Sequence, residues 1–358
     1  MTKKTLTYYA LVDQNKSPGV AKKINDTVIA ARSIGIDAET KVFQPSFSGL
    51  IKFIASILHP RSNLLLIRFS DIAFPFLFLP LTFVRITGRK IIIDVPTPRS
   101  IALSEIDARH KSLAKRILRK SWTYLSGAWI FYPAHRILQY ANESNWFSLG
   151  INYKTIKIGN GIVFSDKRPI TRGKWPSSTL KLIAVAQIAN WHGYDRLIKA
   201  IALLHERRPE LRIEAVIVGD GDDLSNLKHL AQELHLCDRV VFTGSLTGTA
   251  LDSAFEGAHI GVASLGLFRK NIQEASDLKT REYLSRGLPV IATGIDPDFS
   301  ADSPFRFTVP NNEDISLLAD LLQNFFQKEL PQAEAAVNYA KDHLSLESKI
   351  KLILKDFL

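Results

Sequence analysis

Short apolar runs alternate with amphipathic segments along this sequence. The run Leu6–Val12 predicts a strand, and Val20–Ile34 carries apolar residues at helical spacing after a break at Ser17-Pro18-Gly19. Strands that alternate with helices form parallel sheets, so the first half is predicted to be an α/β domain. Further strands are predicted at Val42–Phe43, Leu64–Phe69, Lys90–Val95, Trp129–Tyr132 and Thr155–Ile158, with a helix at Ala134–Phe147.

A second alternation begins at Leu182, after a polar stretch, Ser165–Ser178, whose prolines and glycine are typical of an interdomain linker. We expect a first domain over residues 1–163, a linker over 164–178, a second domain over 179–340 and a last helical segment over 341–358. Strands of the second half are predicted at Leu182–Ile188, Ile213–Val218, Val240–Thr243, Ile260–Ala263 and Val290–Ala292. Helices of this half are predicted at Tyr194–Glu206, Leu224–Leu234, Ala250–Glu256, Leu278–Arg286, Asp314–Gln327, Gln332–His343 and Glu347–Phe357.

Two segments of the first half are candidates for a membrane surface. Phe74–Val84 is the most apolar segment, but it is too short to span a bilayer and contains two prolines, so it is either a buried helix or an interfacial patch. The run Lys111–Lys120 places Leu113, Ile117 and other apolar residues on one helical face and its cations on the other. A solvated charged face is the alternative for this run.

Charge divides the chain unevenly. The 358 residues carry a net charge of +11, with 25 Lys and Arg against 10 Asp and Glu in residues 1–170, and 21 against 25 in the remainder. A basic first half suggests an anionic partner, either nucleic acid or a membrane surface. The one cysteine, Cys237, excludes an intramolecular disulfide, and the polar start of the sequence favours a reducing, cytoplasmic location.

The stretch Glu274–Ala292 is the strongest candidate for a ligand site. Its segment Leu278–Arg286 predicts a short helix that Gly287 ends, with Glu282 inside the helix and Glu274 in the loop before it. The free N–H groups of a first helical turn bind phosphate, and carboxylates beside them are suited to receive hydroxyl groups. A nucleotide sugar has phosphates between two hydroxyl-rich rings. The alternative is a chance pair of glutamates on a solvated helix.

Glu274-x7-Glu282 followed by Gly287-Leu288-Pro289-Val290 resembles the signature of the family-4 retaining glycosyltransferases of GT-B fold. The wider run SLGLFRKNIQEASDLKTREYLSRGLPVIAT is similar to a bacterial branch that makes cell-surface polysaccharides. The resemblance implies two Rossmann-like, doubly wound domains that face each other across a cleft, with the last helix returning to the first domain. It also implies sugar transfer without a metal or another cofactor.

The resemblance assigns roles to residues of the second half. Glu274 is expected to accept hydrogen bonds from the donor sugar and Glu282 from the ribose. The family usually holds the diphosphate with an arginine and a lysine, but Gln187 and His192 occupy those positions here. We therefore expect other cations to bind the phosphates, unless each is merely solvated. The predicted donor-binding set is Glu282, Lys279, Arg269, Lys270, Ser276, Asp277, Leu278, Thr280, Gln187, His192 and Gly244.

In the first half, Asp94 follows the apolar run of IIIDVPTP. It is predicted to act as a general base or to orient the acceptor, and the alternative is a helix cap. Gly19 is the candidate of the first loop on the acceptor side. The expected acceptor is a glycan or lipid-linked glycan, reached by peripheral binding to the anionic inner face of the plasma membrane.

Other functions remain as alternatives. An NAD-dependent sugar-nucleotide-modifying enzyme is suggested by Gly219-x-Gly221, but Leu224 stands where the third glycine of the fingerprint belongs. Asp220-x-Asp222 and Asp296-x-Asp298 match the Asp-x-Asp motif that binds a metal in a different glycosyltransferase fold. That fold has one domain, so two complete α/β domains argue against it. A basic nucleic-acid-binding protein is the other alternative, although no helix-turn-helix or RNP-like strand is present. We expect no bound metal and no nucleic acid.

Overall fold

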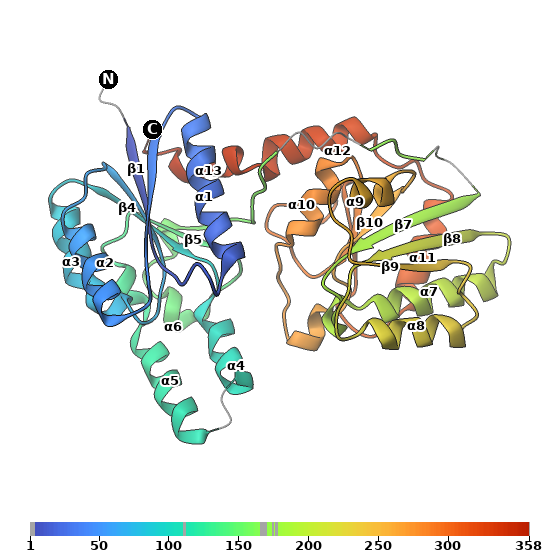
Figure 1. The fold of residues 1–358 in the computed structure, drawn as a ribbon, viewed down its shortest axis with the longest axis horizontal. Helices are drawn as coiled ribbons and strands as arrows, with labels where there is room; N and C mark the ends of the chain where they lie inside the picture. Colours follow the sequence, from blue (N-terminus) through green and yellow to red (C-terminus); the bar gives the residue numbers. More distant parts are fainter. Residues whose placement is uncertain (1–3, 110–111, 165–169, 174, 176–177, 358) are drawn as a thin grey trace. The chain divides into compact units, whose positions relative to one another are not determined.

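The computed structural model describes residues 4–109, 112–164, 170–173, 175 and 178–357 of the chain. The chain forms two compact units, Met1–Gly159 with Leu346–Leu358, and Asn160–Ser345 (Figure 1). Each unit is a doubly wound α/β fold, as predicted from the alternation of strands and helices.

The first unit is built on a six-stranded parallel sheet in the order β2-β1-β3-β4-β5-β6. Helices cover both faces, so the central strands are nearly continuous apolar runs, such as LLLIR in β3. The strands are β1 (Thr5–Leu11), β2 (Asp37–Phe43), β3 (Leu64–Arg68), β4 (Lys90–Val95), β5 (Arg136–Gln139) and β6 (Thr155–Lys157).

The helices of the first unit include one from the far end of the sequence. Helix α13 packs against α1, and Arg136 of β5 donates hydrogen bonds to the carbonyl of Ile353 and the carboxylate of Asp356. The α-helices are α1 (Pro18–Ser33), α2 (Phe47–Leu58), α3 (Phe74–Ile86), α4 (Arg99–Arg109), α5 (Leu113–Leu125), α6 (Asn145–Ser148) and α13 (Leu346–Leu354). The 3-10 helices are η1 (Ala128–Phe131) and η2 (Asn152–Lys154).

The predictions of a strand at Trp129–Tyr132 and a helix at Ala134–Phe147 are wrong. The first run forms η1, which packs against α3 with the rings of Trp129 and Phe78 5.2 Å apart. The strand is β5, whose four residues are all buried although two of them are polar. A short apolar run fits a buried turn as well as a strand, and hydrophobicity alone does not distinguish them.

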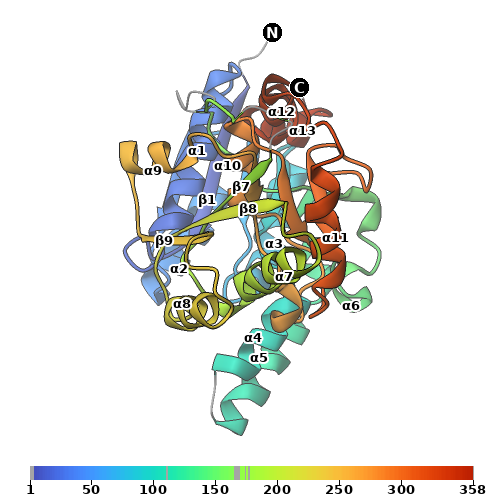
Figure 2. The ribbon, with the colours of Figure 1, turned by 90° about the vertical axis from the view of Figure 1, so that its right-hand side faces the viewer.

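Helices α3 and α5 leave apolar side chains on the surface. Helix α3 buries one side, including Leu77 and Leu81, as the buried-helix alternative predicts. Its other side is open, with Leu79 76% exposed and Ile86 79% exposed. Helices α4 and α5 pack on each other and project from the rest of the first unit (Figures 1 and 2). Thr123 is the buried residue of α5. Lys111, the first residue of the predicted basic run, lies outside the described residues.

The second unit has a six-stranded parallel sheet in the order β12-β11-β10-β7-β8-β9. Counted from β7, this is the 3-2-1-4-5-6 order of a Rossmann fold, in which the order reverses between β7 and β10. The strands are β7 (Thr179–Val185), β8 (Arg212–Val218), β9 (Val240–Gly244), β10 (Ile260–Val262), β11 (Val290–Thr293) and β12 (Arg306–Val309).

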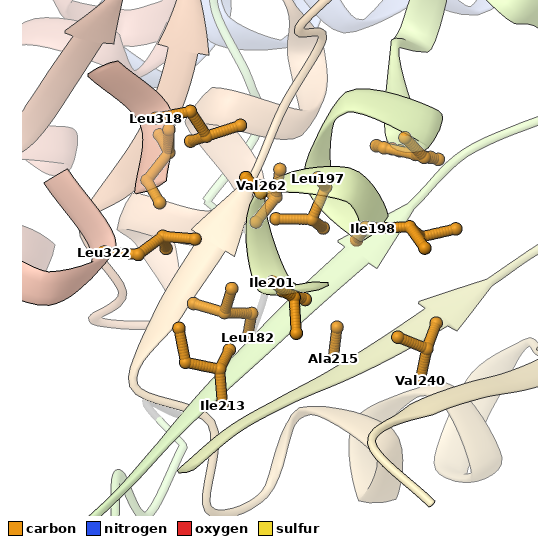
Figure 3. Close-up of a cluster of buried hydrophobic side chains, with 14 of the residues drawn as sticks. Leu182, Leu197, Ile198, Ile201, Ile213, Ala215, Val240, Val262, Leu318 and Leu322 are labelled. Carbon is orange, nitrogen blue, oxygen red and sulfur yellow. The ribbon is translucent and has the colours of Figure 1, made fainter. Parts of the chain in front are cut away.

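Helix α7 lies between α8 and α11 on one face of this sheet (Figure 2). Its apolar side chains, including Leu197 and Ile201, meet Leu182 of β7 and Ile213 of β8 in a continuous core (Figure 3). The α-helices are α7 (Tyr194–Arg207), α8 (Leu224–Glu233), α9 (Gly248–Phe255), α10 (Leu278–Ser285), α11 (Ser316–Phe325) and α12 (Ala333–Tyr339). The other helical segments are η3 (Asn190–His192), η4 (Leu267–Lys270) and the π-helical η5 (Ala340–Leu344).

Parts of the predicted linker lie outside the described residues, namely 165–169, 174 and 176–177. The described residues from Ile170 onward pack on the second unit. Ile170 is buried in its core, and the indole N–H of Trp175 donates to the carbonyl of Lys328 at 2.8 Å. The boundary of the second unit at Asn160 therefore precedes the predicted linker.

Candidate functional site

The predicted helix after Glu274 is α10. It runs from Leu278 to Ser285 with Arg286 as its C-cap, and the next residue, Gly287, takes the left-handed conformation with φ of +89°. Thr280, in the first turn of the helix, is buried. Leu278, at its start, is 58% exposed. The first-turn N–H groups of a helix have no acceptor within the helix. Here the N-cap residue, Asp277, does not accept a hydrogen bond from them through its side chain.

The loop that carries Glu274 is held by strand-like pairing with Ile295. The N–H of Ala275 donates to the carbonyl of Ile295 at 3.0 Å, and the N–H of Ile295 donates to the carbonyl of Gln273 at 2.8 Å. These bonds fix the backbone on both sides of Glu274. Its place in the loop before the helix is the one that the sequence predicts.

Glu282 lies inside α10 beside a cation. Its Oε1 accepts from the guanidinium of Arg286 at 3.3 Å, and the same guanidinium pairs with Asp252 at 2.7 Å. Arg286 also stands over the ring of Phe255 at 4.2 Å. These contacts orient the carboxylate of Glu282, whose oxygens can accept hydrogen bonds from hydroxyl groups.

Lys279 stands in the first turn of α10. Its Nζ is buried without a hydrogen-bond partner among the described residues and lies 5.9 Å from the ring centre of Tyr194. Burial lowers the pKa of Lys279 to about 8. A desolvated, unpartnered ammonium beside free helix N–H groups is well suited to an anion.

His192 is a neutral neighbour of this lysine. Its Nδ1 accepts the N–H of Ala189 at 3.1 Å, which leaves the proton of the neutral ring on Nε2. Burial, with the nearby charge of Lys279, lowers the pKa of His192 to about 4. His192 can therefore donate one hydrogen bond at neutral pH, but it does not supply a positive charge.

The predicted cations Arg269 and Lys270 differ in their surroundings. Arg269 donates to both carboxylate oxygens of Asp195, at 2.8 and 2.9 Å, and to Glu313 at 2.8 Å. These carboxylates raise the pKa of Arg269 and compensate its charge. The Nζ of Lys270 lies 4.2 Å from the ring centre of Trp191. This geometry favours Lys279 and Lys270 over Arg269 as phosphate ligands.

Two glycines allow the loops after β7 and β10 to meet where the strand order reverses. Gly193 has a φ of +65°, and a Cβ there would lie 2.6 Å from the backbone nitrogen of Gly266. The N–H of Leu265 donates to the carbonyl of His192 at 2.8 Å. The contact fixes the loop of His192 against the loop that leads to Lys270. In open α/β sheets, this reversal point at the carboxyl ends of the strands is the usual ligand site.

A pocket of about 760 Å³ opens at the carboxyl ends of β7, β8 and β9. A Cβ on Gly219 would lie 1.8 Å from the carbonyl oxygen of Ala186, so only glycine permits this approach of the loops. Gly244 accepts the N–H of Gly219 at 2.8 Å beside the pocket. The lining residues are Val185, Ala186, Gln187, Val218, Gly219, Asp220, Gly221, Asp222, Ser245, Leu246 and Thr247.

Asp94, in the first unit, is buried at 2% exposure. The hydroxyl of Tyr8 donates to its carboxylate, and Arg68 pairs with it at 3.3 Å. Tyr140 belongs to the same cluster, since burial and the charge of Asp94 together raise the pKa of its hydroxyl. Asp94 is thus part of a buried polar cluster, which argues against a solvent-reached general base. Gly19 lies in the first turn of α1, where a Cβ would meet no atom within 4 Å.

The sequence analysis predicted no role in the donor site for Asn160 or Arg281, which hydrogen-bond to the residues that lead into α10. Arg281 is fully buried and pairs with Asp296 and Asp298, the two aspartates that form one of the Asp-x-Asp motifs in the sequence. A buried arginine explains this pair of aspartates without a metal. The described residues contain no group of three or more His, Cys, Asp or Glu arranged to hold a metal ion.

The two doubly wound units have the architecture of the GT-B fold, which solved glycosyltransferase structures share. The lipopolysaccharide outer core galactosyltransferase WaaB, in its apo form, aligns with a TM-score of 0.68 and 12% identity, covering 99% of this chain and 100% of that chain. Anabaena Alr3699/HepE in complex with UDP aligns with a TM-score of 0.60 and 15% identity, with the same coverage of 99% and 100%.

Residues 168–343 match the family model described as "Glycosyl transferases group 1". Over these 176 of its 358 residues the chain is similar to the group 1 glycosyltransferases. The alpha-monoglucosyldiacylglycerol synthase of Streptococcus pneumoniae is 30% identical over 103 residues, a match that spans 28% of this chain and 22% of that relative. Residues 168–343, which the family model matches, contain α10 and the loops that surround it.

Proposed function

We propose that this chain transfers a sugar from a nucleotide-diphosphate sugar, with UDP- and GDP-sugars as the candidate donors. The observation that carries the proposal is Lys279, whose Nζ is buried without a partner in the first turn of α10, between Glu274 and Glu282. A diphosphate is the anion that such a lysine and the first-turn N–H groups bind best. Charge compensation then comes from these groups and Lys270, without a metal or another cofactor. The HepE neighbour with bound UDP supports this choice of donor.

In the proposed reaction, Glu274 accepts hydrogen bonds from the hydroxyls of the donor sugar and Glu282 from the ribose. The bond between the anomeric carbon and the phosphate oxygen breaks, and an acceptor hydroxyl bonds to the same face of that carbon. The acceptor proton passes to the departing phosphate oxygen. Lys279 and the N–H groups from Ser276 to Thr280 stabilise the charge that develops there. The configuration of the anomeric carbon is therefore retained.

The proposed acceptor is a glycan, most simply a lipid-linked glycan of a cell-surface polysaccharide. The name of WaaB, a lipopolysaccharide outer core galactosyltransferase, supports a glycan acceptor. The name of the pneumococcal alpha-monoglucosyldiacylglycerol synthase supports only a lipid in the product. The proposal extends to peripheral binding at the anionic inner face of the plasma membrane. No helix in the described part of the chain has the length and apolarity needed to cross a bilayer.

Helix α5 is the main support for membrane binding. It carries four cations, yet Leu113 is 63% exposed and Leu118 70% exposed on a helix whose buried surface is small. Such helices lie in the interface with apolar side chains among the lipids, and each nearby Lys or Arg adds about 1 kcal/mol on anionic headgroups. The exposed side of α3, with Leu79 and Ile86, offers further apolar contact.

Binding of UDP and GDP to purified protein tests the donor site. Lys279→Met is expected to weaken the preferred diphosphate at least tenfold at pH 7, because the charge-assisted bond is lost. Lys228→Met, on the exposed side of α8, is the matched control and is expected to bind as the wild type does. Equal affinity in wild type and Lys279→Met, or no affinity of the wild type for either diphosphate, would reject the assignment.

Co-sedimentation with anionic and neutral vesicles at two salt concentrations tests the membrane proposal. Binding is expected to anionic vesicles alone and to weaken as salt rises. One variant changes Lys115, Arg116, Arg119 and Lys120 to glutamate. The charge-matched control changes Lys16, Lys22, Lys52 and Arg61, all exposed in the first unit, to glutamate. A similar loss of binding in both variants would indicate net charge rather than α5.

A further inference from the structure

Asn160 hydrogen-bonds to Ser276 in the turn before α10. The backbone N–H of Asn160 donates to Oγ of Ser276 at 2.6 Å, and its side-chain amide donates to the carbonyl of Ser276 at 2.7 Å. Asn160 is 116 residues earlier in the sequence and is the first residue of the second unit. Ser276 is thus bound through both its side chain and its backbone by one residue.

Arg281 completes this support. Its Nε donates to the carbonyl of Asn160 at 3.0 Å, and Nη1 donates to the carbonyl of Asp277 at 3.2 Å. The other guanidinium contacts reach Asp296, at 2.7 Å from Nη2, and Asp298, at 2.5 Å. A planar guanidinium held by two carboxylates has a fixed orientation, so the bonds to Asn160 and Asp277 are fixed as well.

The two residues together determine where the backbone of Ser276 and Asp277 lies. These residues lead directly into Leu278, whose N–H is among the first-turn groups that have no acceptor within the helix. Hydrogen bonds to a bound anion weaken steeply when the donor direction is wrong. Neither Asn160 nor Arg281 needs to touch the ligand to affect its binding.

We propose that Asn160 and Arg281 are positioning residues, which hold the turn Ser276–Asp277 in the orientation that binds the diphosphate of the donor. This inference rests on the proposed function, because it assumes that a diphosphate binds at the start of α10. The coupling is reciprocal: if the support improves diphosphate binding, a bound diphosphate stabilises the support to the same extent. Amide hydrogen exchange at Asn160 and Gly161 is therefore expected to slow when the diphosphate is added.

The experiment compares affinities for a nucleoside diphosphate and its nucleoside, with UDP against uridine and GDP against guanosine. Asn160→Leu removes the amide donors of the side chain without adding charge, and Arg281→Lys keeps a cation but loses the planar fork. Each variant is expected to weaken the diphosphate about tenfold, the equivalent of one hydrogen bond, and to leave nucleoside affinity unchanged. Asn324→Leu, on the exposed surface of α11, is the matched control.

A merely structural role would lower the melting temperature and leave the ratio of diphosphate to nucleoside affinity unchanged. Such a result in both variants, or wild-type affinities throughout, overturns the inference while wild-type binding of UDP or GDP keeps the proposed function. Failure of the wild-type protein to bind either diphosphate would instead reject the proposed function. If Arg281→Lys does not fold, Asn160→Leu and the exchange measurement on the wild type still decide the question.

Discussion

The two units share one architecture but differ in where they place polar and apolar groups. In the second unit, the loops at the carboxyl ends of the strands are fixed by close glycine contacts and by ion pairs such as Arg269–Asp195. In the first unit, Asp94, near the carboxyl end of β4, is buried in an ion pair with Arg68. Helices α3 and α5 of this unit expose large apolar side chains. Two six-stranded parallel sheets, which differ in strand order, therefore support a rigid polar site in one unit and an apolar, cationic surface in the other.

Glu274 and Asp94 give the largest expected contrast. Glu274→Gln is expected to lower donor turnover about 100-fold with little change in stability, because its hydrogen bonds to the sugar strengthen in the transition state. Asp94→Asn is expected to destabilise the first unit by about 3 kcal/mol, because Arg68 loses its buried partner. Transfer assays and thermal unfolding measure both effects. A larger loss of turnover in Asp94→Asn at full stability would restore Asp94 as the catalytic group.

Gly193 and Gly19 test the same substitution in the two units. Gly193→Ala is expected to cost about 2 kcal/mol, because alanine is strained at positive φ and its Cβ would meet Gly266. Gly19→Ala is expected to be neutral or stabilising by up to about 1 kcal/mol, since this position is helical and open. Chemical unfolding measures the free energies. Equal effects in the two variants would show that the loop contact in the second unit is not tight.

The pH dependence of diphosphate binding tests the buried lysine. The pKa of Lys279 in the free protein is about 8, below its usual value, so the ammonium loses its proton as pH rises through 8. Affinity for UDP or GDP is expected to fall above pH 8 by up to about tenfold per pH unit, and not to fall in this way in Lys279→Met. His192 has a pKa of about 4, so the effect of His192→Ala is expected to be the same at pH 6 and pH 8. Titration calorimetry across this range checks both expectations.

The smallest expected effect concerns an exposed leucine of α5. Leu118→Ser is expected to change stability by less than about 0.5 kcal/mol, because Leu118 is 70% exposed. Leu197→Ala, in the core of the second unit, is expected to cost about 3 kcal/mol. Vesicle binding by Leu118→Ser is nevertheless expected to weaken. A substantial loss of stability in Leu118→Ser would show that the α5 surface is covered within the protein.

The sequence predicted an element correctly where the spacing of its apolar residues and the residues that end it indicate the same segment. Helix α10 could be predicted because its apolar positions, its length and Gly287 all indicate the same segment. Strand β5 could not, because its polar residues Arg136 and Gln139 are buried, and the partners of Arg136 lie 217 and 220 residues away in the sequence. Strand β12 was missed because it is only four residues long and begins at a buried arginine, Arg306, which breaks the apolar run.

The candidate site shows a similar division. The spacing of Glu274 and Glu282 is local, so the loop and helix that carry them were predicted from the sequence. Whether a cation is paired depends on tertiary contacts, and the sequence treats Arg269 and Lys279 alike although only Arg269 has carboxylate partners. The support from Asn160 spans 116 residues and leaves no local pattern.

Helix α13 has a consequence for how the protein is made. The sheet of the first unit ends with β6 at Lys157, but this unit also includes Leu346–Leu354, which pack on α1 and bond to Arg136. A ribosome therefore synthesises the entire second unit before the first can acquire its last helix. During that interval the side of α1 that α13 covers in the finished fold stays exposed, and exposed apolar surface favours aggregation of a partly folded chain.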